Sequence, residues 1–388
     1  MNIPIKPMEF ARHKASWTSD RPPFDCIALL LQGGGALGAY QAGVYKGLSE
    51  ARLEPDWVAG ISIGAINAAL IAGNPPERRV ERLREFWHRV SAQLPFIPHA
   101  SIDSMRPMLY QMSTASAFLF GVPGFFTPRM VPPQLALEGS LGALSFYDTM
   151  PLKATLEELV DFALINRNDG VRLSLGAVDL RSGNSVYFDS KTTPIRAEHV
   201  LASGALPPGF PPVPIDGELY WDGGIVSNTP LWYVLDADSR MNALIFQVDV
   251  FSGAGELPKN LAEVQERAKD IQYASKTRFN TNRVKELEAL RGSLRRVLEK
   301  LPEALREDPD VKKLAAVSKP KAISLVHFIN RHHPRATSFK DCEFSRATVT
   351  DLWQGGLTDV RRSIADSQWH RATDYAEGVR VFDMVPKT

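Results

Sequence analysis

A serine lies between two glycines where the residue pattern changes from that of a strand to that of a helix. Residues 57–61 predict a buried strand, and residues 65–73, small and apolar, predict a helix. Gly60, Ser62 and Gly64 form a Gly-x-Ser-x-Gly turn between them. Such a turn presents the serine hydroxyl at the carboxyl end of the strand, beside the positive end of the helix dipole, and a Cβ at either glycine would clash with neighbouring backbone. Ser62 is therefore the candidate nucleophile.

A second glycine-rich turn, Gly33-Gly34-Gly35, follows a predicted buried strand at residues 26–31 and precedes a predicted helix at residues 39–51. Backbone N–H groups in such a turn bind an anion, which is either a phosphate or a developing oxyanion. With Gly38 the spacing also fits the G-x-G-x-x-G of a dinucleotide-binding fold. That alternative needs an acidic residue at the end of the second strand, where Ser62 stands instead. The sequence thus favours an oxyanion hole formed by Gly33, Gly34 and Gly35.

The serine also needs a base, and the carboxylate with the most suggestive surroundings is Asp222. It follows the apolar pair Tyr220-Trp221 and precedes Gly223 and Gly224, which let another backbone come close. A carboxylate that is hydrogen-bonded to the serine can take its proton without a histidine. The common order of serine, acid and histidine is the alternative. It would use one of four late histidines, which are His327, His332, His333 and His370.

Four segments in this order and spacing resemble the patatin-like phospholipase family. They are residues 32–38 (QGGGALG), 60–64 (GISIG), 202–208 (ASGALPP) and 222–224 (DGG). The resemblance covers about residues 25–235. It implies a three-layer α/β/α fold with a mostly parallel central sheet, and a largely helical C-terminal extension like that of some bacterial members.

The same resemblance implies how the site works. Ser62 would be the nucleophile and Asp222 its base, with an oxyanion hole made by backbone N–H groups between Gly33 and Gly38. The residues implied to support these motifs are Gly38, Gly60, Gly64, Gly223 and Gly224. The implied reaction is calcium-independent hydrolysis of acyl esters in phospholipids or lysophospholipids, with no cofactor and no metal. Many members carry Arg or Lys where this chain has Leu37, so a contact to a head-group phosphate is lost here.

Composition sets limits on other functions. The 388 residues carry a net charge of +1, with 44% hydrophobic and 23% charged residues, which is ordinary for a globular protein. No helix carries the basic stripe of a nucleic-acid reader. Two cysteines, Cys26 and Cys342, predict neither a disulfide scaffold nor a metal cluster. No run is apolar and long enough for a membrane span or a signal core, so we expect a cytoplasmic protein with at most peripheral membrane contact.

The chain divides into a leader (1–24), a catalytic domain (25–250) and a mainly helical C-terminal domain (255–388). Residues 93–135 mix large apolar side chains with Pro, Gly and Ser, which predicts an apolar lid or cap. Further helices are expected at 77–90, at 148–165, twice within 261–301, and at 345–369 with an interruption near Gly355-Gly356. Further strands are expected at 171–178, 185–188, 243–250 and 322–329.

Two functions of different class therefore stand. The first is a serine acyl hydrolase that works through an acyl-enzyme at Ser62. The second is a non-catalytic lipid- or acyl-binding protein on the same fold, which would bind lipid without becoming covalently labelled at Ser62.

Overall fold

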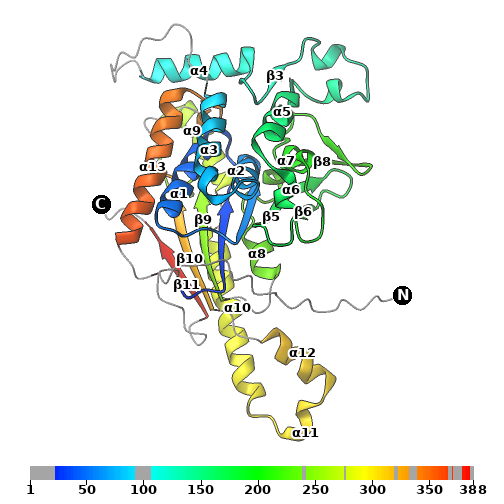
Figure 1. The fold of residues 1–388 in the computed structure, drawn as a ribbon, viewed down its shortest axis with the longest axis vertical. Helices are drawn as coiled ribbons and strands as arrows, with labels where there is room; N and C mark the ends of the chain where they lie inside the picture. The colour runs from blue at the N-terminus through cyan, green and yellow to red at the C-terminus, as the bar shows by residue number, and fades with distance from the viewer. Residues whose placement is uncertain are drawn as a thin grey trace.

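One β-sheet forms the centre of the molecule (Figure 1). The computed structural model describes residues 22–91, 106–237, 242–274, 277–318, 322–331, 339–365, 369 and 378–384. Among these residues the strand order is β11-β10-β9-β1-β2-β5-β8-β7, with β6 also paired to β5. The strands are β1 (Cys26–Leu31), β2 (Trp57–Ile61), β5 (Arg172–Asp179), β6 (Ser185–Asp189), β7 (Val213–Ile215), β8 (Glu218–Asp222), β9 (Asn242–Asp249), β10 (Ala322–Ile329) and β11 (Val379–Asp383).

The sheet is mostly parallel and buried on both faces. All pairings from β11 through β9, β1 and β2 to β5 are parallel, and β6, β7 and β8 join antiparallel. Successive residues of β1 enter different cores, because side chains alternate across a strand: Leu29 lies in one apolar cluster and Leu30 in the other. Continuous apolar runs are what a parallel sheet covered on both sides requires.

Helices cover both faces and complete three layers. The larger core joins the sheet to α1 (Gly38–Glu50), α2 (Ile63–Ala72), α3 (Pro76–Val90) and α13 (Arg346–Ala365). The smaller core packs the opposite face against α8 (Leu231–Ala237). The remaining helices are α4 (Arg106–Phe120), α5 (Met150–Leu159), α6 (Phe162–Ile165), α7 (Ala197–Ser203), α9 (Leu261–Tyr273), α10 (Thr277–Leu298), α11 (Glu303–Arg306) and α12 (Pro309–Val317). The predicted α/β/α architecture is confirmed.

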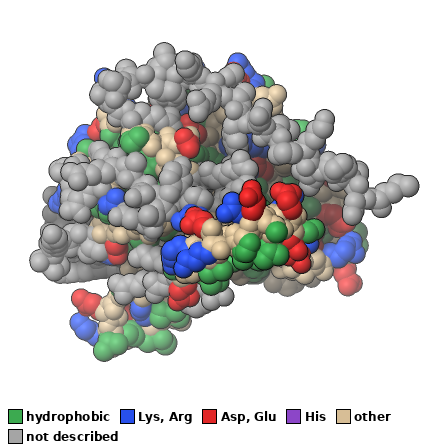
Figure 2. All heavy atoms as spheres, turned by 90° about the horizontal axis from the view of Figure 1, so that it is seen from below, with side chains coloured by type: hydrophobic (Ala, Val, Ile, Leu, Met, Phe, Trp, Pro, Cys, Tyr) green, Lys and Arg blue, Asp and Glu red, His purple; other side chains and the backbone are tan. Residues whose placement is uncertain are grey.

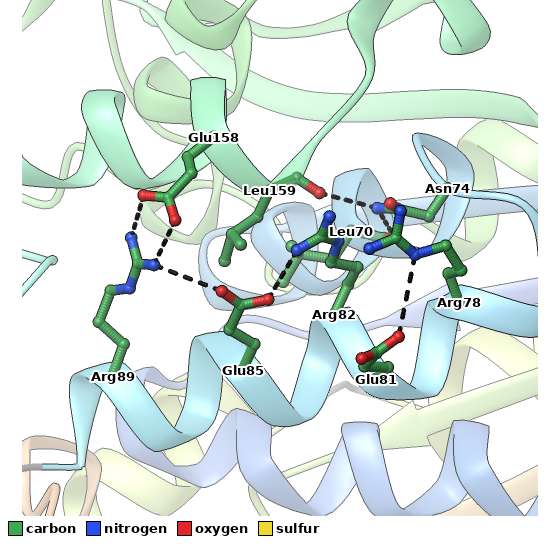
Figure 3. Close-up of polar contacts among 9 residues, drawn as sticks. All are labelled: Leu70, Asn74, Arg78, Glu81, Arg82, Glu85, Arg89, Glu158 and Leu159. Atoms are coloured by element: carbon green, nitrogen blue, oxygen red, sulfur yellow. Dashed lines mark hydrogen bonds and ion pairs between the residues drawn. The ribbon is translucent and has the colours of Figure 1, made fainter.

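Helix α3 connects the nucleophile-bearing half of the fold to α5 through polar contacts (Figure 3). The Arg89 guanidinium donates to both carboxylate oxygens of Glu158 in α5, at 2.6 and 2.7 Å. The Asn74 amide, just before α3, donates to the carbonyls of Leu70 in α2 and Leu159 in α5. Since Asn74 is buried, these two bonds fix the end of α2 against α5.

The C-terminal third contributes to this same sheet. Strands β10 and β11 extend it in parallel beyond β9, and α13 packs along α1. The sheet thus contains strands from both sides of the predicted domain boundary between residues 250 and 255. The division into two domains stays a prediction. Helices α10, α11 and α12 project from the opposite end of the molecule to α4 as an arm (Figure 1). Viewed from the end of the arm, hydrophobic side chains lie among acidic and basic ones (Figure 2).

Two expected elements differ in the structure. The interruption predicted near Gly355-Gly356 is wrong, because α13 is continuous there. A Cβ on Gly356 would overlap the Tyr40 carbonyl of α1, so this glycine permits close helix packing rather than breaking the helix. The helix expected over 148–165 divides into α5 and α6, because Val160 turns to extended backbone.

The predicted lid segment contains more regular structure than its composition indicates. Helix α4 occupies residues 106–120, and a small hairpin of β3 (Thr127–Pro128) and β4 (Tyr147–Asp148) follows, with two short 3-10 turns between the strands. Residues 93–105 of the lid and residues 1–21 of the leader lie outside the described residues. In the described part of the chain, no helix combines the length and apolar character of a bilayer span.

Candidate active site

Ser62 occupies the sharp turn between β2 and α2. Its backbone has φ 56° and ψ −125°, a conformation that residues other than glycine rarely adopt. A Cβ on Gly60 would overlap the Gly64 carbonyl, and a Cβ on Gly64 would overlap the Leu31 carbonyl of β1. The two glycines therefore allow the tight turn that holds the Ser62 hydroxyl at the carboxyl end of the strand.

Strand β5 sets the distance between Ser62 and Asp222. Its Gly176 pairs with Ile61, the last residue of β2, and its next residue, Ala177, pairs with Asp222, the last residue of β8. Because β6 occupies the other edge of β5 at both positions, β8 continues on the edge where β2 ends. This register brings together two residues that are 160 positions apart in the sequence.

The Ser62 hydroxyl interacts with the Asp222 carboxylate and acts to lower the pKa of that group. Asp222 is buried, at 2% exposure, and its Oδ1 also accepts the Gly224 N–H at 2.7 Å. Burial raises the pKa of Asp222 to about 7, although the Ser62 hydroxyl and the Gly224 N–H act in the opposite direction. A carboxylate with this pKa and this contact suits a general base near neutral pH.

Ser203 fixes the backbone of the nucleophile from a third element. This residue ends α7 and is fully buried. Its hydroxyl donates to the Gly176 carbonyl at 2.6 Å and accepts the Ser62 N–H at 3.0 Å. One hydroxyl thereby connects the Ser62 turn to β5. We assign this role to residues 202–208, one of the four segments on which the family resemblance depends.

The glycine turn after β1 lies beside Ser62. A Cβ on Gly33 would come within 3.0 Å of the Ser62 Cβ. The Gly33 N–H already donates to the Asn228 carbonyl at 3.3 Å, so this amide is engaged. No described residue accepts a hydrogen bond from the N–H of Gly34 or Gly35. These two amides are therefore the members of the predicted oxyanion hole that remain available to a ligand.

A chain of buried amide side chains connects this turn to the nucleophile helix. Gln41 of α1 donates to the carbonyl of Gln32, which directly precedes the glycines. Asn67 of α2 donates to the Gln41 side chain at 2.9 Å and to the Gly38 carbonyl at 3.0 Å, and accepts from the Trp87 indole at 3.0 Å. Since these groups are buried and mutually satisfied, they hold the two turns in one geometry.

The C-terminal region completes the wall behind the glycine turn. The Tyr273 carbonyl, at the end of α9, accepts from the Gln32 side chain at 3.0 Å and from Asn228 at 3.0 Å. The Asp341 carbonyl lies against Gly35, where a side chain would otherwise be. Asn228 was not predicted as a site residue, and neither was the C-terminal contribution, because no motif marks them.

Two lysines, the buried Lys340 and the half-buried Lys269, hold this C-terminal wall. The Lys340 ammonium lies 2.6 Å from Asp270 and 3.2 Å from Glu266, both on α9. Lys269 of α9 lies 2.6 Å from the Asp341 carboxylate. The ion pairs thus join α9 to η5 (Lys340–Cys342), the short turn that contacts the glycine loop.

The alternative base His327 lies elsewhere. It is on β10, in register with Gln247 of β9, Leu30 of β1 and Ala59 of β2. Three strand spacings separate it from β2, which is about 14 Å. Burial lowers its pKa. It is therefore too far from Ser62 to accept its proton, and His332, His333 and His370 lie outside the described residues.

Comparison with known proteins agrees with this α/β/α arrangement. A family model described as Patatin-like phospholipase matches residues 29–235, more than half of the chain. A second family model, described as Patatin phospholipase, matches residues 271–376. The chain therefore belongs to the patatin-like phospholipase family.

Individual relatives are distant. Patatin-like phospholipase domain-containing protein 6 of Homo sapiens is 28% identical over 204 residues, which are 53% of this chain and 12% of that protein. Putative patatin-like phospholipase domain-containing protein M110.7 of Caenorhabditis elegans is 40% identical over 63 residues, 16% of this chain and 6% of that protein. Among solved structures, VipD from Legionella pneumophila aligns with a TM-score of 0.37 and 15% identity, over 89% of this chain and 67% of that chain, a likeness too weak to bear on function.

Proposed function

We propose that this protein is a serine acyl hydrolase that cleaves acyl esters of phospholipids or lysophospholipids. The observation that supports it most is the strand register that places a buried Asp222 carboxyl, whose pKa burial raises to about 7, beside Ser62. Near neutral pH such a carboxyl both accepts and returns a proton. Membership of the patatin-like phospholipase family supports the lipid class of the substrate.

Acylation begins with proton transfer from Ser62 to Asp222. The Ser62 Oγ forms a bond to the ester carbonyl carbon, and the carbonyl oxygen becomes an oxyanion. In the proposed step, the N–H groups of Gly34 and Gly35, in the loop that follows Gly33, donate to this oxyanion. The carbon–oxygen bond to the alcohol then breaks, the alcohol leaves with the proton from Asp222, and an acyl-enzyme remains.

Deacylation uses the same groups in reverse. A water gives its proton to Asp222 while its oxygen attacks the acyl carbon. The tetrahedral intermediate collapses, the fatty acid leaves, and the proton returns to the Ser62 Oγ. Each proposed step uses only groups of this chain and water.

Leu37 affects the choice of substrate. This side chain is buried at 2% exposure, inside the larger core, so the position offers no charge to a head-group phosphate. We therefore expect the chain to depend on the acyl group more than on the phosphate for recognition.

Release of fatty acid from lysophosphatidylcholine, phosphatidylcholine and a short soluble ester, in the presence of a chelator, tests the proposal. We expect release from all three substrates by the wild type and none above background by Ser62→Ala. A folded wild type that releases no fatty acid from any of them would contradict the proposal and favour the lipid-binding alternative.

A further inference from the structure

Within helix α4, side-chain burial is described for residues 110–120, and in this part the apolar and polar sides are reversed. The residues buried there are small or polar: Ser113, Thr114 and Ala117. The large apolar residues that follow at its end, Leu119 and Phe120, are 68% and 76% exposed. A helix on the surface of a globular protein normally turns its apolar side to the core, so this reversal indicates that α4 faces an apolar partner.

The turns that follow α4 are equally exposed. Met130, Leu135 and Leu137 have exposed fractions of 100%, 77% and 82%. We define an apolar rim by six exposed side chains: Leu119, Phe120, Met130, Val131, Leu135 and Leu137. Residues 110–150 contain only three charged residues, Arg129, Glu138 and Asp148. The rim is therefore a nearly uncharged surface.

Two contacts connect the rim segment to the candidate active site. On one side, the N–H groups of Phe146 and Tyr147 donate to the carbonyls of Pro208 and Gly209, in the loop that leaves Ser203. On the other side, the Phe118 ring packs edge-on against Phe339, which begins the turn η5 beside the glycine loop. Both ends of the rim segment are thus anchored to elements that lead to the site.

We propose that the apolar rim docks this protein on the surface of a lipid bilayer, with the candidate active site facing the lipid. This inference rests on the proposed function, because acyl chains of phospholipids reside in such a bilayer. A protein partner would require directional hydrogen bonds across its interface, and the rim has few polar side chains to supply them. A bilayer accepts irregular apolar side chains at its head-group boundary. The charged arm extends from the opposite end of the molecule, away from the docked surface (Figure 1).

The near absence of charge sets the expected binding behaviour. Docking through apolar side chains does not require anionic lipid and changes little with salt, whereas attraction between charges weakens as salt rises. We therefore expect the full chain to co-sediment with phosphatidylcholine vesicles at both low and high ionic strength.

The decisive experiment compares two triple variants of the full chain in vesicle co-sedimentation. Met130→Ser/Leu135→Ser/Leu137→Ser removes part of the rim, and Leu305→Ser/Leu314→Ser/Val317→Ser removes three aliphatic side chains of the arm that are 48%, 45% and 58% exposed. We expect the rim variant to bind phosphatidylcholine vesicles about tenfold or more weakly and the arm variant to bind like the wild type. Both variants should hydrolyse a short soluble ester at the wild-type rate.

Other results would overturn the proposal. The first is wild-type protein that stays in the supernatant when the vesicles sediment. The others are a rim variant that binds vesicles as tightly as the wild type, and vesicle binding that high salt abolishes. If the wild type does not bind vesicles but forms a concentration-dependent dimer, and the rim variant stays monomeric, the rim would instead be an interface with a second copy of the chain. Ser62→Ala should still bind vesicles, so loss of catalysis and loss of docking are distinguished.

Discussion

The two halves of the central sheet differ in the kind of residue that follows their strands. Strands β1, β2 and β8 end in the glycine turn, in Ser62 and in Asp222, where unusual backbone geometry and close approach leave little choice of residue. Strand β9, and strands β10 and β11 from the C-terminal third, complete the sheet without such turns. Their part supplies support, through α13 against α1 and through the α9–η5 wall behind the glycine loop. The difference is that chemistry depends on a few exact residue types, whereas support depends on packing and charge pairing spread over many.

The largest expected effect is on the chemical side of this comparison. Asp222→Asn removes the proposed base and keeps its shape, so kcat should fall about 10³-fold or more while KM changes little. In the wild type, kcat/KM should rise with pH through about 7 as the Asp222 carboxyl ionises. A variant with near wild-type kcat, or a wild type with no ionisation in this range, would remove Asp222 from the mechanism.

The same substitution should change stability in a pH-dependent way. The pKa of Asp222 is raised by burial to about 7 in the folded protein, above its value in the unfolded chain. The folded state therefore holds a proton that the unfolded state has lost, and stability from this group falls as pH rises toward 7, by about 1.4 kcal/mol per pH unit. Asp222→Asn has no such loss. Urea unfolding at about pH 5 and about pH 8 should show the variant gaining stability relative to the wild type at the higher pH; a constant difference would contradict the assignment.

A buried cation tests the support side. Lys340→Met leaves Glu266 and Asp270 without their partner, which should lower the free energy of unfolding by about 3–5 kcal/mol. If α9 and η5 position the glycine loop, kcat should also fall in the protein that remains folded. The control Lys312→Met breaks an exposed pair on the arm with Glu307 and should leave both quantities nearly unchanged. Equal effects of the two variants would mean that the C-terminal wall has no special role.

A smaller effect is expected from the contact between the Ser62 turn and strand β5. Ser203→Ala removes the hydroxyl that links the Ser62 N–H to the Gly176 carbonyl. Loss of these bonds should lower kcat about five- to tenfold with little change in KM, since the Ser62 N–H keeps the Ser203 carbonyl as an acceptor. Ser203→Thr, which retains the hydroxyl, serves as the comparison. A rate for Ser203→Ala equal to the wild type would limit Ser203 to a packing role.

The elements and residues that could be predicted from the sequence are those where two backbone segments lie so close that only certain residue types fit. The strands at 26–31 and 57–61 and the turn at Ser62 follow from apolar runs and from glycines whose Cβ atoms would overlap backbone. Gly356 shows the limit of such reasoning, because the same residue type that ends a helix also lets two helices touch, and only the position of α1 distinguishes the two cases. Asn228 and Lys340 could not be predicted, since their partners are distant in the chain and ordinary in type.

The central claim is that Ser62 is a nucleophile activated by Asp222, and covalent labelling tests it most directly. A fluorophosphonate probe, mapped by mass spectrometry, should label wild-type protein at Ser62, should not label Ser62→Ala at this position, and should label Asp222→Asn much more slowly. Folded wild-type protein without label at Ser62 would contradict the claim and leave the fold with a lipid-binding function instead.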